Sequence, residues 1–173
     1  MRIALCGEAR SGKDTVGECL EGFHRLAFGH YMKEAYFKKF PEKRYLPKDR
    51  EDMIAFSQPK EERDPLIWVR PLDRDMRIWH SGGVDNFVIT DLRQPHEEKW
   101  CRDNSFHIVR VHSNEIIRHE RMRKHGERPQ KDLTYWVAAD FHIYNGGSLE
   151  DLQSQVDNLL DCLNEQEMKR RRL

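Results

Sequence analysis

The chain begins with a short apolar run that leads directly into a glycine-rich turn. Ile3-Ala4-Leu5-Cys6 precedes the segment Gly7–Thr15, GEARSGKDT, and apolar residues at helical spacing follow at Val16, Cys19 and Leu20. A strand, a tight turn and a helix in this order form a phosphate-binding arrangement, because backbone N–H groups and the helix N-terminus converge on an anion. This feature favours an α/β fold with an anion site at the carboxyl end of the first strand.

The glycine-rich turn follows the pattern G-x-x-x-x-G-K-[ST] at all but one position. Gly7 and Gly12 allow close approach of phosphate, and Lys13, on a turn expected to be exposed, can reach the β- and γ-phosphates. Asp14 stands where the pattern has Ser or Thr. Because Mg²⁺ prefers hard oxygen ligands, the Asp14 carboxylate and the neighbouring Thr15 hydroxyl are candidate metal ligands. The acid is therefore compatible with nucleotide binding.

Composition limits the remaining possibilities. The 173 residues suffice for one domain, and 30 basic and 30 acidic side chains give a net charge of zero, which argues against nucleic acid or an anionic membrane as the main partner. The first residues lack the apolar stretch of a signal peptide, so we expect a soluble, cytoplasmic protein. Widely separated cysteines predict reduced thiols rather than a zinc site or disulfides: Cys6, Cys19, Cys101 and Cys162.

The rest of the chain alternates between strand and helix patterns, which predicts a parallel sheet with helices on both faces. Later strands are expected at 25–28, 87–90, 106–111 and 141–144. Helices are expected over 31–40, after a cap at Asp49, from Asp64-Pro65 to Trp79 with a kink or a break at Pro71, and after a capping box of Ser148 and Asp151. Residues 167–173 are expected to form a solvated basic tail.

A second polar cluster, DLRQPHEE, follows the predicted strand 87–90, starting at Asp91. The carboxyl ends of parallel strands share one edge, so this cluster should face the glycine-rich turn. Arginine is the side chain that binds phosphate in a bidentate manner, which makes Arg93 a candidate for a phosphate-bearing acceptor. A structural ion pair between Asp91 and Arg93 is the alternative.

Two motifs resemble those of one enzyme family. The segment Arg10–Thr15 resembles the turn of phage deoxynucleoside monophosphate kinases and of phosphomevalonate kinases. The second cluster resembles the D-x-R-Q-x-H-E motif of the former at Asp91, Arg93, Gln94, His96 and Glu97. Further likeness lies in Leu26-Ala27, Lys33-Glu34-Ala35, Trp68-Val69 and the segment Asn145 to Leu152. The resemblance implies a P-loop NTPase-like parallel sheet of nucleoside monophosphate kinase architecture, with a lid.

The resemblance also implies site residues. ATP would be bound by Gly7, Ala9, Arg10, Ser11, Gly12, Lys13, Asp14, Thr15, Asn145 and Gly146. The acceptor would be bound by Lys33, Arg50, Trp68, Asp91, Arg93, Gln94 and Glu97, and the metal by Asp14, Thr15 and Asp91. Trp68 could stack on a base, but its neighbours have the spacing of a core helix, so a place in the core is the alternative.

Residues 113–130 carry a run of basic side chains. Arg118 and Arg121 are three apart, so on a helix they point the same way. By the resemblance this segment is a mobile lid whose arginines join Lys13 and Arg10 in stabilising the transferring phosphoryl group. A solvated basic helix is the alternative.

The sequence therefore predicts a kinase that transfers the γ-phosphoryl group of ATP, with Mg²⁺, to a (deoxy)nucleoside monophosphate, in the cytoplasm of the host cell if the chain is phage-encoded. Two alternatives stay open. One is another P-loop kinase, acting on dephospho-coenzyme A or phosphomevalonate; the other is a non-catalytic nucleotide-dependent regulator that uses 113–130 as a switch. A homodimer is compatible with the sequence, which does not fix the oligomeric state or the preferred base.

Overall fold

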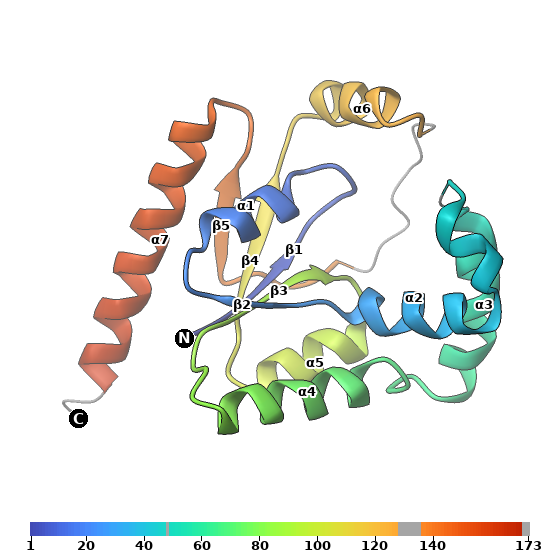
Figure 1. Ribbon diagram of the computed structural model, residues 1–173. Helices are drawn as coiled ribbons and strands as arrows, with labels where there is room; N and C mark the ends of the chain where they lie inside the picture. The colour runs from blue at the N-terminus through green and yellow to red at the C-terminus, as the bar shows by residue number, and fades with distance from the viewer. Residues whose placement is uncertain (48, 128–135, 171–173) are drawn as a thin grey trace.

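Five parallel strands form the centre of the protein (Figure 1). The computed structural model describes residues 1–47, 49–127 and 136–170. The strand order is β2-β3-β1-β4-β5, and every neighbouring pair is parallel. The strands are β1 (Arg2–Cys6), β2 (His24–Leu26), β3 (Phe87–Leu92), β4 (His107–His112) and β5 (Phe141–Tyr144). The predicted α/β fold with a parallel sheet is confirmed.

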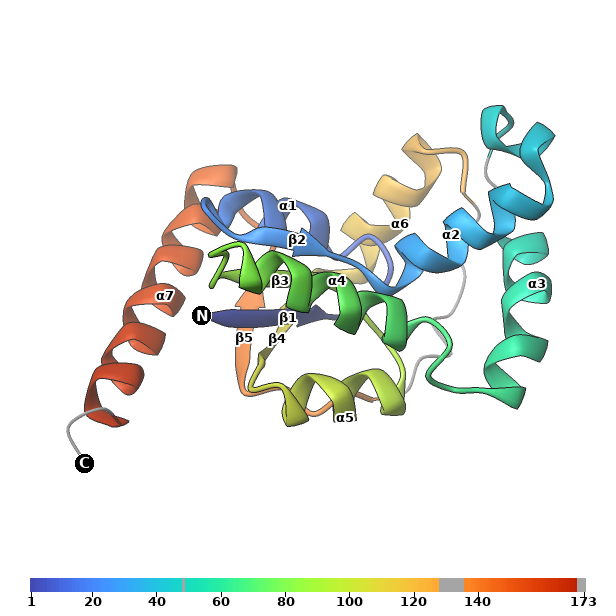
Figure 2. The ribbon, with the colours of Figure 1, turned by 60° about the horizontal axis from the view of Figure 1, so that its bottom comes forward.

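Apolar side chains of β1 alternate between two helical layers. Ile3 and Leu5 pack with α1 (Lys13–Cys19) and α7 (Leu149–Arg170), whereas Ala4 and Cys6 pack with α4 (Val69–Ser81) and α5 (Pro95–Asp103). Successive side chains of a strand point to opposite faces, so a continuous apolar run indicates burial on both. Figure 2 shows α1 and α5 on opposite sides of the sheet.

Three elements form an arm beside the sheet, on the right in Figure 1. They are α2 (Phe28–Lys39), the 3₁₀ helix η1 (Pro41–Tyr45) and α3 (Arg50–Arg63). The Tyr36 ring is 1% exposed and lies 5.2–5.4 Å from the rings of Phe37, Phe40 and Phe56. As predicted, Asp49 caps α3 by accepting a hydrogen bond from Asp52 N at 3.0 Å. The arm thus has an aromatic core of its own.

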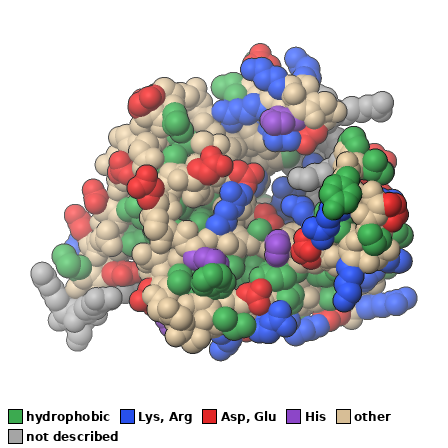
Figure 3. Space-filling view, viewed as in Figure 1, with side chains coloured by type: hydrophobic (Ala, Val, Ile, Leu, Met, Phe, Trp, Pro, Cys, Tyr) green, Lys and Arg blue, Asp and Glu red, His purple; other side chains and the backbone are tan. Residues whose placement is uncertain are grey.

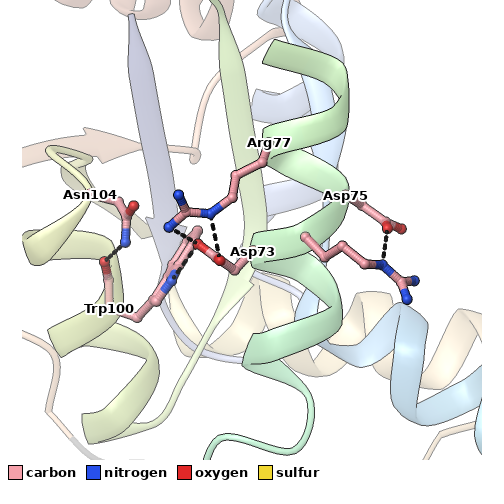
Figure 4. A network of polar contacts seen from close by, with 6 residues as sticks. Asp73, Asp75, Arg77, Trp100 and Asn104 are labelled. Atoms are coloured by element: carbon pink, nitrogen blue, oxygen red, sulfur yellow. Dashed lines mark hydrogen bonds and ion pairs between the residues drawn. The ribbon is translucent and has the colours of Figure 1, made fainter. Parts of the chain in front are cut away.

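A hydrogen bond joins α4 to α5, with further polar contacts beside it within each helix (Figure 4). Trp100 Nε1 donates to Asp73 Oδ1 at 3.3 Å, and Arg77 Nε donates to the other oxygen of that carboxylate at 2.8 Å. Asn104 Nδ2 donates to the carbonyl oxygen of Trp100 at 2.9 Å. Of these three bonds, the one from Trp100 to Asp73 runs between the helices and links α5 to α4, while the other two lie within α4 and at the C-terminal end of α5.

Two helices begin at residues other than those predicted. The helix expected at 31–40 begins at Phe28, because Asp91 accepts hydrogen bonds from the first N–H groups of α2. The helix expected from Asp64 begins at Val69, after a turn in which Asp64 accepts from Leu66 N. Pro71 therefore lies in the first helical turn, where an N–H has no intrahelical acceptor, and α4 continues across it without a break.

The C-terminal region is more helical than expected. The predicted capping box is confirmed, since Ser148 N donates to Asp151 Oδ2 at 2.9 Å and Asp151 N donates to Ser148 Oγ at 3.1 Å. From there α7 runs to Arg170, so 167–170 belong to a helix, and 171–173 lie outside the described residues. No described helix is long and apolar enough to cross a membrane. All four cysteines are free thiols, three of them buried.

Candidate active site

The glycine-rich turn connects β1 to α1 and leaves no room for side chains at its two glycines. Gly7 has a φ of 137°, and a Cβ there would lie 2.4 Å from the carbonyl oxygen of Val111. Gly12 has a φ of 98°, and its Cβ would lie 1.8 Å from Asn145 Nδ2. Both conformations favour glycine, and both close approaches require it. The turn has the backbone shape that brings N–H groups together at the start of α1.

Lys13 is buried, which corrects the expectation of an exposed lysine. It is 7% exposed, and its Nζ donates to the carbonyl oxygens of Gly7 and Glu8 at 2.8 Å each. The ammonium group is therefore folded back over the turn. A phosphate oxygen is a stronger acceptor than a neutral carbonyl, because charge-assisted hydrogen bonds are stronger. The lysine is thus held beside the place where an anion would bind.

Asn145 ties the end of β5 to the glycine-rich turn. Its backbone N donates to His112 O at 2.7 Å, and its Nδ2 donates to Ser11 O at 2.9 Å. Ser11 is 1% exposed, and its Oγ has no hydrogen-bond partner in the described part of the chain. A Cβ on Gly146 would meet no atom within 4 Å. The predicted ATP-binding residues of the turn and of the β5–α7 loop are therefore neighbours, and Ser11 offers an unused hydroxyl.

Helix α6 (Glu115–Lys124) lies against the turn with two arginines on the same side. Arg118 is 6% exposed, and its Nη2 lies 3.1 Å from Glu8 Oε1. Arg121 Nη1 donates to Arg10 O at 3.1 Å. The shared direction predicted from their spacing is confirmed. Residues 128–130 of the predicted lid, including Arg128, lie outside the described residues.

A second link between the α6 segment and the turn runs through Arg10, a residue with a φ of 60°. Its Nε and Nη2 donate to the two carboxylate oxygens of Glu127 at 3.0 and 2.5 Å. This hydrogen-bonded pair raises the pKa of Arg10 and lowers that of Glu127. Neither Glu8 nor Glu127 is predicted as a site residue from the sequence, since residues so far from their partners along the chain leave no local pattern.

The second polar cluster leaves the strand next to β1. Cys6 pairs with Leu92 in the sheet, so the residues that follow them, Gly7 and Arg93, emerge side by side. Neighbouring strands are about 5 Å apart. The predicted meeting of the two clusters at one sheet edge is therefore confirmed. Figure 3 shows Lys and Arg side chains on both sides of the hollow between α6 and the α2–α3 arm.

Asp91 and Arg93 do not form the alternative structural ion pair. The Asp91 carboxylate accepts hydrogen bonds from Phe28 N at 2.9 Å and Gly29 N at 2.8 Å. No carboxylate oxygen of the described residues lies within 4.0 Å of the Arg93 guanidinium. Burial raises the pKa of Asp91, while those N–H groups and the charges of Arg93 and Lys33 act in the opposite direction. Arg93 is thus a half-buried cation without an ion-pair partner in this part of the structure.

Glu97 holds the backbone of the same turn. It is 8% exposed, and its Oε2 accepts from Arg93 N at 2.8 Å and Gln94 N at 2.9 Å. Burial, and then the negative charge of Asp91, raise its pKa to about 8. The observed contacts of Glu97 are those of a residue that positions Arg93, and its predicted contact with an acceptor stays a prediction.

Replacing Glu97 by Gln should make the protein more stable than the parent at pH 8.5 and about equally stable at pH 5. The raised pKa means that the folded protein holds a proton that the unfolded chain releases, so Glu97 lowers the free energy of unfolding as the pH rises from its ordinary pKa of 4.5 to about 8. Each pKa unit corresponds to about 1.4 kcal/mol. Melting temperatures at both pH values test this; an equal difference at the two would contradict it.

The remaining predicted acceptor residues surround this cluster. Trp68 is half-buried, and its Nε1 donates at 2.8 Å to Glu61 Oε1, which also accepts from Ser57 Oγ. Lys33 lies on α2 and is also half-buried. Arg50 begins α3, is exposed, and helps to lower the pKa of Glu127, so it lies toward the α6 segment. Their contacts with an acceptor stay predictions.

The predicted metal ligands are suited to an Mg²⁺ ion that the phosphates of a nucleotide would help to hold. Asp14 is 75% exposed and pairs with Arg25, and Thr15 follows it. Both oxygens of Asp91 already accept backbone hydrogen bonds. Among the described residues no group of three or more His, Cys, Asp or Glu side chains could hold a metal ion. Mg²⁺ commonly takes one or two carboxylates together with substrate phosphates, and the residues present suit that mode.

Comparison with known proteins identifies the family. The sequence model described as deoxynucleotide monophosphate kinase matches residues 61–156, more than half of the chain. The chain belongs to this family. Family membership makes it a small-molecule kinase, a phosphotransferase. The match includes Trp68, the cluster after Asp91 and the arginines of α6. It begins after the glycine-rich turn, so the geometry of the turn supports a kinase independently of the match.

Solved structures share the fold of this kinase family member. TT1252 from Thermus thermophilus is 22% identical, with 94% of this chain and 97% of that chain covered and a TM-score of 0.57. An unliganded sugar kinase from Janibacter sp. HTCC2649 is 16% identical, with 92% and 94% covered and a TM-score of 0.56. No curated protein matches the chain. The chain thus shares its fold with these two proteins over nearly its whole length.

Proposed function

We propose that this protein transfers the γ-phosphoryl group of ATP to a deoxynucleoside monophosphate, giving the diphosphate. The observation that carries the proposal is the pairing of Cys6 with Leu92, which places the glycine-rich turn beside Arg93. The glycine-rich turn and a cation that has no ion-pair partner among the described residues then meet at adjacent strand ends. Such a site suits two phosphate-bearing substrates, and the family match supports the nucleotide acceptor.

ATP, the phosphoryl donor, would be bound by cations that already surround the turn. Lys13, Arg10 and Arg118 would exchange their present oxygen partners for phosphate oxygens, and Arg121 on the same face of α6 would join them. Asp14 and Thr15 would hold Mg²⁺, which neutralises charge on the phosphates. No general base is needed, because the acceptor is already an anionic phosphate oxygen. Alignment and charge stabilisation therefore make up most of the catalysis.

The acceptor side falls to the cluster after β3. Arg93 would bind the acceptor phosphate through two parallel hydrogen bonds, on a backbone that Glu97 fixes. Trp68, oriented by Glu61, would offer a ring face to the base. Lys33 and Arg50 would add positive charge on the arm side of the hollow. In this proposal the phosphate end of the acceptor would point toward the turn.

A panel of acceptors tests the proposal. The protein is incubated with ATP and Mg²⁺ and with each of the four common deoxynucleoside monophosphates, dephospho-coenzyme A or phosphomevalonate, and ADP release is measured. At least one deoxynucleoside monophosphate should stimulate release well above the rate with ATP alone. Stimulation only by one of the other two acceptors would identify a different kinase, and no stimulation by any of them would favour the regulator.

A further inference from the structure

Arg25 connects the glycine-rich turn to the edge of the sheet. This residue lies in β2, and its Nε donates to Thr90 Oγ1 at 3.2 Å. Its Nη2 donates to Asp14 Oδ1 in the first turn of α1. One guanidinium therefore bridges the carboxyl end of β3 and the acidic residue that follows Lys13. Arg25 is not among the site residues predicted from the sequence.

The two contacts of the Arg25 guanidinium differ in exposure: the one with Thr90 is partly buried, and the one with Asp14 is exposed. Thr90 is 3% exposed, and α1 packs so closely on it that a Cβ on Gly17 would lie 2.8 Å from Thr90 Cγ2. The other end is open to solvent, since the side chains of Arg25 and Asp14 are 44% and 75% exposed. Ion pairs as exposed as this one contribute little stability, so the loss of this pair to another cation costs little. Arg25 is thus anchored at Thr90 and free to release Asp14.

Asp14 creates an electrostatic problem that a hydroxyl at its position would not create. A carboxylate at the start of α1 lies beside the place where the nucleotide's phosphates bind, and like charges repel. A cation on the carboxylate removes this repulsion. The guanidinium of Arg25 supplies such a cation in the nucleotide-free protein.

We propose that Arg25 is a positioning residue for the metal of the phosphate site: it neutralises Asp14 when no metal is bound and competes with Mg²⁺ for that carboxylate. The inference rests on the proposed function, because it takes ATP as the ligand of the turn. It makes Arg25 and Asp14 a coupled pair. Removing Arg25 should therefore weaken nucleotide binding in the absence of metal and lower the Mg²⁺ concentration at which the metal acts.

Binding experiments on the purified full chain test the coupling without relying on turnover. A fluorescent ATP analogue is titrated in EDTA, and again at increasing Mg²⁺, into the parent protein, Arg25→Gln, Asp14→Asn and the double variant. In Arg25→Gln the Kd of the analogue without metal should rise roughly three- to tenfold, and the Mg²⁺ concentration for half-maximal effect should fall by a similar factor, as expected for unit charges about 4 Å apart that are screened as in bulk water.

The double variant and a matched control decide how the effect arises. In the Asp14→Asn background, Arg25→Gln should neither raise the Kd of the analogue without metal nor lower the Mg²⁺ concentration for half-maximal effect. Arg74→Gln removes a comparable arginine, 71% exposed and paired with its neighbour Asp75 on α4, and should leave both constants unchanged. Melting temperatures check folding. If Arg25→Gln does not fold, Asp14→Asn alone serves: the analogue should bind at least as tightly without metal, and Mg²⁺ should enhance its binding less than in the parent.

Several results would overturn the inference. Constants equal to those of the parent in Arg25→Gln would show that Arg25 does not act on the metal site. The same shifts in the Asp14→Asn background would show that Arg25 acts on the phosphates directly. In both cases the parent still binds the analogue, so the proposed function stands. A parent protein that binds no analogue with or without Mg²⁺ would overturn the proposed function as well.

Discussion

Replacing Lys13 by Met should lower kcat/KM for ATP by roughly 100- to 1,000-fold, because a preorganised charged donor to the transferring phosphoryl group contributes about 3–4 kcal/mol of transition-state stabilisation. Methionine keeps most of the buried stem and removes the ammonium group. The carbonyl oxygens of Gly7 and Glu8 lose a hydrogen-bond donor, at a cost of about 1 kcal/mol. Steady-state kinetics and a melting curve on the same preparation separate the two effects.

Lys99→Met is the matched control for this substitution. Lys99 lies on α5, is exposed and pairs with Asp103 one helical turn away. Its replacement should leave kcat/KM unchanged. A folded Lys13→Met protein that retains the parent's turnover would contradict the assignment of the glycine-rich turn to ATP.

Replacing Arg93 by Ala should weaken the acceptor strongly and leave ATP nearly unaffected. The guanidinium has no ion-pair partner among the described residues, so its charge is available to the acceptor phosphate. Loss of a bidentate charged contact should lower kcat/KM for the acceptor by a factor that corresponds to roughly 2–4 kcal/mol of lost transition-state stabilisation. Arg93→Lys should recover only part of this, because an ammonium group cannot form two parallel hydrogen bonds. Separate titrations of ATP and of the acceptor measure the two effects.

Arg74→Ala is a suitable control for Arg93→Ala, since Arg74 is 71% exposed on α4 and pairs with its neighbour Asp75. It should change neither Michaelis constant. If Arg93→Ala raised both Michaelis constants equally and lowered the melting temperature, Arg93 would be a structural residue. If the acceptor constant did not change, the acceptor phosphate would bind elsewhere.

The sheet could be predicted because local patterns determine its strands. The apolar runs before Gly7 and Asp91 are buried on both faces, and burial of that kind leaves a clear signal in sequence. Helix starts were less predictable where the cap comes from far along the chain. Asp91 supplies hydrogen-bond acceptors to the first turn of α2, 62 and 63 residues away, and no pattern near Phe28 indicates this.

The motifs of the candidate site could be predicted from the sequence, but the residues that contact those motifs could not. The glycines, Lys13 and the cluster after β3 follow from spacing and from strand ends. Glu8, Glu127 and Arg25 became visible only in the structure, because each acts through a contact that the fold creates. The burial of Lys13 also depends on its hydrogen bonds to the turn, whereas sequence position alone suggested exposure.

Product analysis with γ-labelled ATP tests the central claim most directly. The protein is incubated with Mg²⁺, the labelled ATP and the deoxynucleoside monophosphate that stimulates ADP release most, and the labelled products are separated. The label should appear in the deoxynucleoside diphosphate in a one-to-one ratio with ADP, and it should disappear from that product in Arg93→Ala at low acceptor concentration. Label found only in inorganic phosphate, whichever acceptor is present, would contradict transfer to a nucleotide.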